Sequence, residues 1–222
     1  MPETTPAEDR RYAVLVPVKP PAFAKSRLAP VGDAARVELA TAFAADTVTA
    51  ALGCPVVERV LVVTDDHVLA GWMRDLGADV LPDATTDDLN ATLVQAAAEM
   101  HRRDPSLALV GLCADLPALR TDELAEALSA ADPERMSFVA DRDGVGTTAV
   151  VAPTLTEFRP AFGPGSRQRH LDEGAVEITA EVPTVRRDVD DPDALAEAVA
   201  LGVGPRTSLV TTMLRAAPED LG

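Results

Sequence analysis

Short, continuous apolar runs alternate along the chain with longer stretches that mix apolar and polar residues. The clearest runs are Tyr12–Val18, Val60–Val63 and Leu107–Leu112. Runs of this length with polar flanks are typical of strands that are buried on both faces of a sheet. The pattern therefore predicts a sheet whose strands are mostly parallel.

The stretches between these runs have the period of amphipathic helices. In Asp33–Leu52, the residues Leu39, Phe43 and Thr47 recur at i, i+4 and i+8 and would share one buried face. Gly77 stands where a helix C-cap belongs. The remaining expected helices are Asp65–Leu76, Asp87–His101 (capped by Asp87 or Asp88), Thr121–Ala131 (capped by Thr121) and Asp191–Leu201, and the remaining expected strands are Asp79–Leu81, Ser137–Ala140, Thr148–Ala152, Ile178–Val182 and Thr184–Arg186.

The alternation of strands and helices predicts an α/β fold with a mostly parallel central sheet and helices on both faces. We expect one domain over residues 11–204, with flexible tails at 1–10 and 205–222. In such sheets, ligands bind at the carboxyl ends of the strands. The segments that follow the strands ending near Val18, Val63 and Leu112 should therefore meet at one edge.

Composition narrows the class of protein. The chain has 222 residues, of which 47% are hydrophobic, and its longest apolar run is far short of the roughly 18 residues that a membrane helix requires. The acidic segment Met1–Asp9 is unlike a signal peptide, so we expect a cytoplasmic protein. Cys54 and Cys113 have no metal-ligand spacing and are expected to be two thiols rather than a disulfide.

Charge argues against two classes of partner. A formal net charge of -16 disfavours nucleic-acid backbones and anionic membranes. Aromatic residues make up only 3% of the chain, which disfavours base stacking on aromatic platforms. A small anionic substrate would need a local positive pocket or metal ions.

The two lysines of the chain, Lys19 and Lys25, lie in one loop after the first strand, and Arg27 follows them. Lysine carries a compact point charge, which suits clustered phosphate oxygens better than a planar guanidinium does. Neither GxxxxGK[ST] nor GxGxxG occurs here, but a proline-rich loop can still present cations to a polyphosphate. The alternative is an ordinary solvated basic loop.

Carboxylates follow two of the expected strands. Asp115 comes directly after the run ending at Leu112 and suits Mg²⁺, although a turn or N-cap role is also open. Asp188 and Asp190 would point to the same side of an extended segment, and one of them could complete a metal site with Asp115. Asp191 before Pro192 is more typical of a helix cap.

Two glycine-rich segments, Gly144–Thr148 and Phe162–His170, indicate a second anion pocket, for an acceptor rather than for a nucleotide. Their glycines allow close backbone approach, and the hydroxyls of Thr148 and Ser166 can bond an anion. Two ordinary turns are the alternative. Asn90, at the start of an expected helix, could cap that helix or bond a base or ribose.

These segments together resemble a known family. In chain order the relevant motifs are Lys25-Ser-Arg-Leu-Ala-Pro30, Asp83…Leu89-Asn90, Ala114-Asp115-Leu-Pro117, Gly146-Thr-Thr148, Phe162-Gly-Pro-Gly-Ser166…His170 and Asp188-Val-Asp190. They are similar to those of the 2-phospholactate / phosphoenolpyruvate guanylyltransferases of coenzyme F-420 biosynthesis. The resemblance covers Tyr12 to Leu201 and implies a single-domain, Rossmann-like nucleotidyltransferase fold of the GT-A type.

The resemblance also implies roles for individual residues. It implies that Asp115 and Asp188 hold Mg²⁺, that Asn90 binds guanosine, and that GTP and phosphoenolpyruvate or 2-phospholactate are the substrates. Ala118 and Leu119 depart from the further acidic residues that some relatives carry, which leaves the metal ligands open. The acceptor would be bound by Thr148, Gly163 and Ser166, the triphosphate by Lys19, Lys25 and Arg27, and catalysis would rest on Lys25 and Asp115.

Other functions stay open at this point. A nucleotidyltransferase for a molybdopterin or sugar-phosphate acceptor would need a wider acceptor pocket with polar groups for a ring. A non-catalytic nucleotide-binding domain would bind GTP and release no diphosphate, but binding alone does not need a metal-ready carboxylate. A scaffold role explains none of the clustered residues, and the sequence does not decide whether the chain forms a homo-oligomer.

Overall fold

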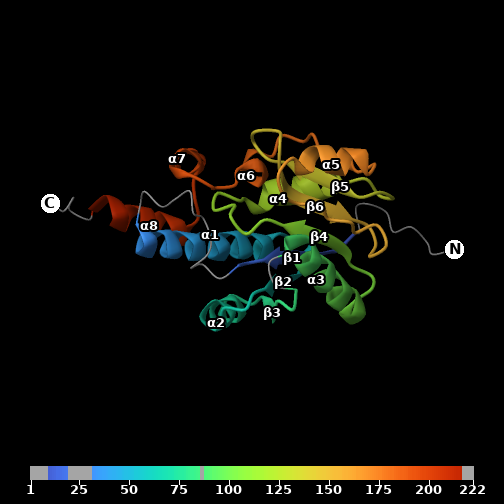
Figure 1. Ribbon diagram of the computed structural model, residues 1–222, viewed down its shortest axis with the longest axis horizontal. Helices are drawn as coiled ribbons and strands as arrows, with labels where there is room; N and C mark the ends of the chain where they lie inside the picture. Colours follow the sequence, from blue (N-terminus) through green and yellow to red (C-terminus); the bar gives the residue numbers. More distant parts are fainter. Residues whose placement is uncertain (1–9, 20–31, 86–87, 217–222) are drawn as a thin grey trace.

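The computed structural model describes residues 10–19, 32–85 and 88–216 (Figure 1). The strands are β1 (Tyr12–Pro17), β2 (Val57–Val63), β3 (Asp79–Leu81), β4 (Ala108–Leu112), β5 (Ser137–Ala140), β6 (Thr147–Ala152) and β7 (Val176–Glu177). The helices are α1 (Asp33–Gly53), α2 (His67–Asp75), α3 (Leu89–Arg103), α4 (Thr121–Ser129), α5 (Ser166–Asp172), α6 (Pro183–Arg186), α7 (Pro192–Leu201) and α8 (Pro205–Ala216).

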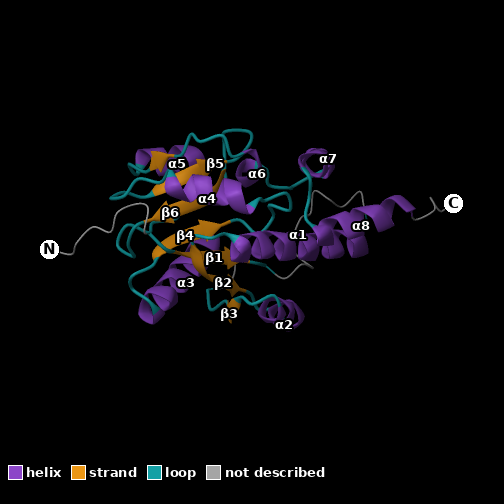
Figure 2. Ribbon diagram, turned by 180° about the vertical axis from the view of Figure 1, so that it is seen from behind, coloured by secondary structure: helices purple, strands orange, loops and turns teal. Residues whose placement is uncertain are grey.

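The strands form one seven-stranded sheet in the order β3-β2-β1-β4-β6-β5-β7. Figure 2 shows this order, from β5 at the top of the view to β3 at the bottom. The described pairings are parallel except those of β6, which runs antiparallel to both β4 and β5. The expected α/β fold with a mostly parallel sheet is therefore confirmed. The reversed β6 begins at the same edge of the sheet where β4 and β5 end.

Alternate residues of each strand point to opposite faces of the sheet, and each face has its own apolar cluster. Val14 and Val16 pack in the cluster that includes α1, α2 and α4. Ala13 and Leu15 pack in the cluster that includes α3. The sheet is thus covered on both sides, which explains why its strands read as continuous apolar runs.

Helix α1 is the main helix of the fold. Leu39, Phe43 and Thr47 are all completely buried, as their spacing predicts. Leu39 and Phe43 belong to a third apolar cluster, which lies away from the sheet and includes residues of α7 and α8. Helix α1 therefore packs on the sheet with one side and on the C-terminal helices with another.

Several element ends were predicted correctly and others were not. Asp88 caps α3 and Asp191 caps α7 with their side chains, as expected. Thr121 is the first residue of α4 rather than its cap, which is Arg120. Thr184–Arg186, expected as a strand, lies in the short helix α6 that begins at Pro183. The strand expected at Ile178–Val182 is also wrong, because β7 ends at Glu177, and α5 was not anticipated.

The expectation of a tail beyond residue 204 is wrong for residues 205–216, because these form α8, which lies along α1 (Figure 1). The buried carboxylate of Asp46 on α1 accepts from Arg206 N–H at 3.1 Å and Thr207 N–H at 2.8 Å. These are amide donors of the first turn of α8, which have no partner within the helix. A side chain remote in sequence thus caps this helix, which is why local spacing does not reveal it.

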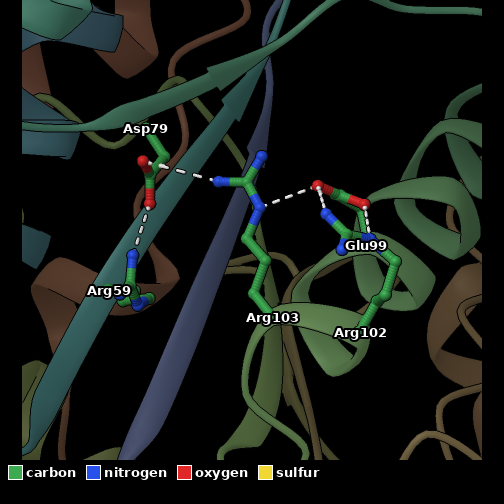
Figure 3. A network of polar contacts seen from close by, with 5 residues as sticks. All are labelled: Arg59, Asp79, Glu99, Arg102 and Arg103. Atoms are coloured by element: carbon green, nitrogen blue, oxygen red, sulfur yellow. Dashed lines mark hydrogen bonds and ion pairs between the residues drawn. The ribbon is translucent and has the colours of Figure 1, made fainter.

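A chain of charged side chains joins the C-terminal end of α3 to the edge of the sheet (Figure 3). Arg103 lies 3.4 Å from Asp79 of β3 and 2.7 Å from Glu99, and Asp79 also pairs with Arg59 of β2. Hydrogen bonds from Arg102 and Arg103 lower the pKa of Glu99 to about 2. Because these side chains are between 22% and 71% exposed, the network is expected to add little to the stability of the fold.

Cys54 and Cys113 form no disulfide with each other, in agreement with the sequence prediction. None of the helices in the described part of the chain has the length and apolar content that a membrane crossing requires.

Replacing Asp46 by alanine should destabilise the protein, because two amide donors at the start of α8 lose their acceptor. We expect a loss of about 1–3 kcal/mol in the free energy of unfolding, measured by urea denaturation. Gly204→Ala should act on the same contact, since the added Cβ would clash with the side chain of Asp46.

The matched control for this prediction is Glu134→Ala, which removes an exposed acidic side chain. It should change the free energy of unfolding by less than about 0.5 kcal/mol. If Asp46→Ala were as mild as this control, the cap on α8 would not contribute to stability.

Candidate active site

The turn that carries Asp115 is held by a buried hydroxyl from α1. Thr47 Oγ1 lies 3.2 Å from the carbonyl oxygen of Ala114 and accepts a hydrogen bond from Leu116 N–H at 3.1 Å. The residues on both sides of Asp115 thus lie within hydrogen-bond distance of the same oxygen atom, whose single proton is shared between Ala114 C=O and Phe43 C=O, which is 2.8 Å away. This arrangement fixes the backbone from which the Asp115 side chain projects at the carboxyl end of β4.

The same turn is joined to the second acidic segment. The carbonyl oxygen of Asp115 accepts from Val189 N–H at 3.0 Å, so Asp115 and Asp188 lie on adjoining backbone segments. Val189 is completely buried in the cluster on α1, and in an extended segment its neighbours point the other way. Asp188 and Asp190 both line the cleft described next, together with their neighbours Arg187 and Asp191.

A cleft of about 740 Å³ opens at this edge of the sheet. One wall is formed by the turn before α5, and the opposite wall by the segment before α7 and by the first turns of α7. The acidic side chains that line it are Asp141, Asp143, Asp188, Asp190, Asp191, Asp193 and Glu197. So strong a negative charge at a single site disfavours an anionic ligand unless cations accompany it.

Arg187 is the one basic side chain among the described residues that line this cleft. Its side chain is 8% exposed, and its Nη2 lies 2.6 Å from a carboxylate oxygen of Glu197 on α7. A guanidinium has five N–H donors, so this ion pair leaves capacity for a further anion. Arg187 was not singled out from the sequence, where it is one of many arginines.

The structure brings Gly163 and Ser166 to the cleft together with Asp188, whereas Asp115 is not among the described residues that line it. Thr148 is placed differently, because its side chain is completely buried and its hydroxyl donates to Val139 C=O at 3.5 Å. The neighbouring Thr147 lines the cleft and accepts from the Ser166 hydroxyl at 3.1 Å. Strand alternation puts the two threonines on opposite faces, and nothing in the sequence decides which one faces the cleft.

Asn90, expected at the guanosine, has its amide engaged by the protein. Its Nδ2 donates to the carbonyl oxygen of Phe162 at 3.1 Å, and its Oδ1 accepts from Phe162 N–H at 2.7 Å. His170 is completely buried and lies between the aromatic rings of Phe138 and Phe162. Burial, with the neighbouring Arg169 charge, lowers the pKa of His170 to about 4.

The structure describes only the first residues of the lysine loop. Lys19 is exposed just beyond β1, at the edge of the sheet where Asp115 also lies. Lys25 and Arg27 lie outside the described residues, so their expected position near Asp115 stays a prediction. Among the side chains that the structure describes, no group of three or more His, Cys, Asp or Glu is gathered so as to hold a metal ion by itself.

Comparison with known proteins identifies the family. Residues 12–211 match the family described as "Guanylyl transferase CofC like". A phosphoenolpyruvate guanylyltransferase of Thermomonospora curvata is 46% identical over 215 residues, which cover 96% of this chain and 94% of that protein. The phosphoenolpyruvate guanylyltransferase of Streptomyces coelicolor is also 46% identical, over 92% of this chain and 97% of that protein.

Solved structures with much lower identity share the fold. A nucleotidyl transferase from Methanothermobacter has a TM-score of 0.62 at 16% identity, covering 93% of this chain and 99% of that one. A 4-diphosphocytidyl-2C-methyl-D-erythritol synthase has a TM-score of 0.60 at 11% identity, covering 86% and 99%. The fold is thus that of GT-A-like nucleotidyltransferases. The extent of the sequence match shows that this chain belongs to the CofC-like family of guanylyl transferases.

Proposed function

We propose that the protein transfers GMP from GTP to the phosphate of phosphoenolpyruvate and releases diphosphate, in the biosynthesis of coenzyme F-420. The observation that carries this proposal is the cleft in which the Gly163–Ser166 turn faces Asp188 beside the Asp115 turn. The turn offers backbone and hydroxyl donors to a small anion, and the carboxylates offer oxygen ligands to a cation. The names of the relatives support phosphoenolpyruvate as the acceptor.

The proposed cofactor is Mg²⁺, held by Asp115 and Asp188. Mg²⁺ is commonly bound through one or two carboxylates together with substrate phosphates and water, so a complete protein cage is not needed. The backbone bond between Asp115 and Val189 keeps the two carboxylates on adjoining segments, which fits this ligand set. When bound, the ion would neutralise charge on the phosphates, as the acidic cleft requires.

The protein's own residues position two anions for direct transfer. An oxygen of the acceptor phosphate attacks the α-phosphorus of GTP, a new P–O bond forms, and the bond from the α-phosphorus to the bridging oxygen breaks as diphosphate leaves. The acceptor phosphate is already a nucleophile, so no covalent enzyme intermediate is required. Catalysis then depends on in-line placement and on charge stabilisation. Lys19, Lys25 and Arg27 would hold the triphosphate, and Lys25 would stabilise the departing diphosphate.

We assign the acceptor's anionic end to Arg187 and the Gly163–Ser166 turn. Arg187 carries the positive charge on the cleft wall, and its ion pair with the exposed carboxylate of Glu197 holds the guanidinium in place. 2-Phospholactate is the alternative acceptor, since it differs from phosphoenolpyruvate at one carbon. A cytoplasmic location is expected for an enzyme of this kind.

Asp115→Asn should keep the fold and lose activity, because the amide cannot neutralise a divalent cation. At an effective dielectric constant of about 20, a close charge pair is worth roughly 4 kcal/mol, so we expect a loss of about 10²–10³ in rate. The measurement is diphosphate release from GTP with phosphoenolpyruvate and Mg²⁺, compared with the exposed-site control Asp122→Asn. Turnover near that of the wild type would rule out the metal role of Asp115.

Arg187→Ala should raise the KM for phosphoenolpyruvate by about 10- to 100-fold, the range expected for a lost charge-assisted hydrogen bond. The KM for GTP should change much less. Glu197→Gln is the matched control, because it removes the other half of the same ion pair and leaves the arginine. If the two variants had the same effect on the acceptor KM, the ion pair itself, and not contact with the acceptor, would explain the role of Arg187.

A further inference from the structure

The turn from Ala161 to Ser166 is fastened at its first two residues by side chains from two helices. Ala161 N–H donates to His170 Nε2 on α5 at 3.0 Å. Phe162 N–H and C=O are both bonded by the amide of Asn90 on α3. The backbone that leads into Gly163 is therefore held by groups that are 72 and 9 residues away in sequence. Arg169 on α5 also donates to the carbonyl oxygens of Ala161 and Pro164.

The contacts of His170 define its protonation. Because Nε2 accepts a hydrogen bond from a backbone amide, the ring proton must lie on Nδ1. Nδ1 then donates to Thr147 Oγ1, which is 3.0 Å away. The lowered pKa of His170, about 4, agrees with a neutral ring. A protonated ring would place a second N–H against that of Ala161 and break the contact.

Thr147 joins the turn to the sheet. Its Oγ1 accepts from His170 Nδ1–H and from Ser166 Oγ–H at 3.1 Å, so both donors come from α5. His170 also stacks on Phe138 of β5 with 5.3 Å between ring centroids, and Phe162 contacts its edge at 5.9 Å. Helix α5, which follows the turn, is therefore hydrogen-bonded through two of its side chains to Thr147, the first residue of β6.

The segment between the two fastened ends needs unusual backbone geometry. Gly163 has φ 124° and Gly165 has φ 69°, which side chains rarely adopt. The N–H groups of both glycines have no hydrogen-bond partner within the described part of the chain, and both residues line the cleft. A turn with free donors is useful for binding only if its ends do not move.

We propose that Asn90 and His170 are positioning residues that fix this turn to receive the acceptor's anionic group. The proposal rests on the proposed function for the identity of the acceptor. It also gives Asn90 a different role from the guanosine contact expected from sequence. The amide of Asn90 already makes two hydrogen bonds to Phe162, so only its second N–H and the second lone pair of Oδ1 are left for a base.

Matched substitutions separate the contacts. Asn90→Ala removes both bonds to Phe162, whereas Asn90→Asp keeps an acceptor for Phe162 N–H. His170→Gln keeps an acceptor for Ala161 N–H, and His170→Asn keeps a donor toward Thr147. Gln95→Ala is the control on α3, because Gln95 bonds Pro82 and Ala84 of a different loop. Gln168→Ala is the control on α5, where the side chain is exposed and bonds only Asp172 among the described residues.

We expect Asn90→Ala to raise the KM for phosphoenolpyruvate at least tenfold and to leave the KM for GTP within twofold of the wild type. Asn90→Asp should be intermediate, and His170→Gln and His170→Asn should each recover part of what His170→Ala loses. The two control variants should behave as the wild type does. A rise in the KM for GTP with an unchanged acceptor KM would overturn the proposal and restore the guanosine role of Asn90.

Hydrogen exchange provides a readout that does not depend on turnover. In the wild type, the amides of Ala161 and Phe162 should exchange slowly, and each should exchange at least tenfold faster in the variant that removes its acceptor. Unchanged exchange in Asn90→Ala and His170→Ala would refute the fastening. If the wild type released no diphosphate with phosphoenolpyruvate, the proposed function would fail, while the exchange data would still decide whether these side chains hold the turn.

Discussion

The arrangement of the cleft depends on the backbone bonds around Asp115. One hydroxyl, Thr47 Oγ1, reaches from the buried face of α1, accepts from Leu116 N–H and lies 3.2 Å from the carbonyl oxygen of Ala114. The carbonyl oxygen of Asp115 is in turn bonded by Val189 N–H, which carries the constraint to Asp188. Because Thr47 is completely buried, the backbone on which the two aspartates stand is set by the packing of the core.

A second constraint acts on the opposite wall of the cleft, which is formed by the turn before α5. The proposed function requires the two carboxylates to lie close together in spite of their repulsion. It requires the turn from Ala161 to Ser166 to present donors at a fixed place. Side chains hold the turn in place, because its glycine-containing backbone lacks the regular hydrogen bonds of a strand or helix. The reversed strand β6 brings the two walls together, since Cys113 after β4 bonds Thr148 C=O at the start of β6.

The sequence predicts the fold well where burial and period are strong. The runs at β1 and β4 and the stripe Leu39–Phe43–Thr47 were found because one physical requirement, a buried face, sets the identity of every residue in them. The helix α6 was mistaken for a strand because only four residues carry the signal. Helix α8 was missed because its cap, Asp46, lies 160 residues away from Arg206, and no local pattern records such a contact.

The site was predicted in part for the same reason. Motif spacing identified Gly163, Ser166 and Asp188, which the structure brings to one cleft. It did not identify Arg187 or Thr147, because a threonine beside another threonine, or an arginine beside another arginine, gives no sign of which one faces the ligand. Asn90 was recognised as important, but its bonding to Phe162 connects segments 72 residues apart and requires the folded structure to be seen.

Asp46 and Thr47 are consecutive residues of α1, and each holds a different segment of the chain. The first binds the start of the C-terminal helix and the second binds the Asp115 turn. Proteolytic trimming after Gly204 would therefore leave a buried carboxylate with no amide donors directly beside the hydroxyl that holds the turn. Such a cleavage lies far from any substrate. We would expect it to reduce enzymatic activity before it unfolds the sheet.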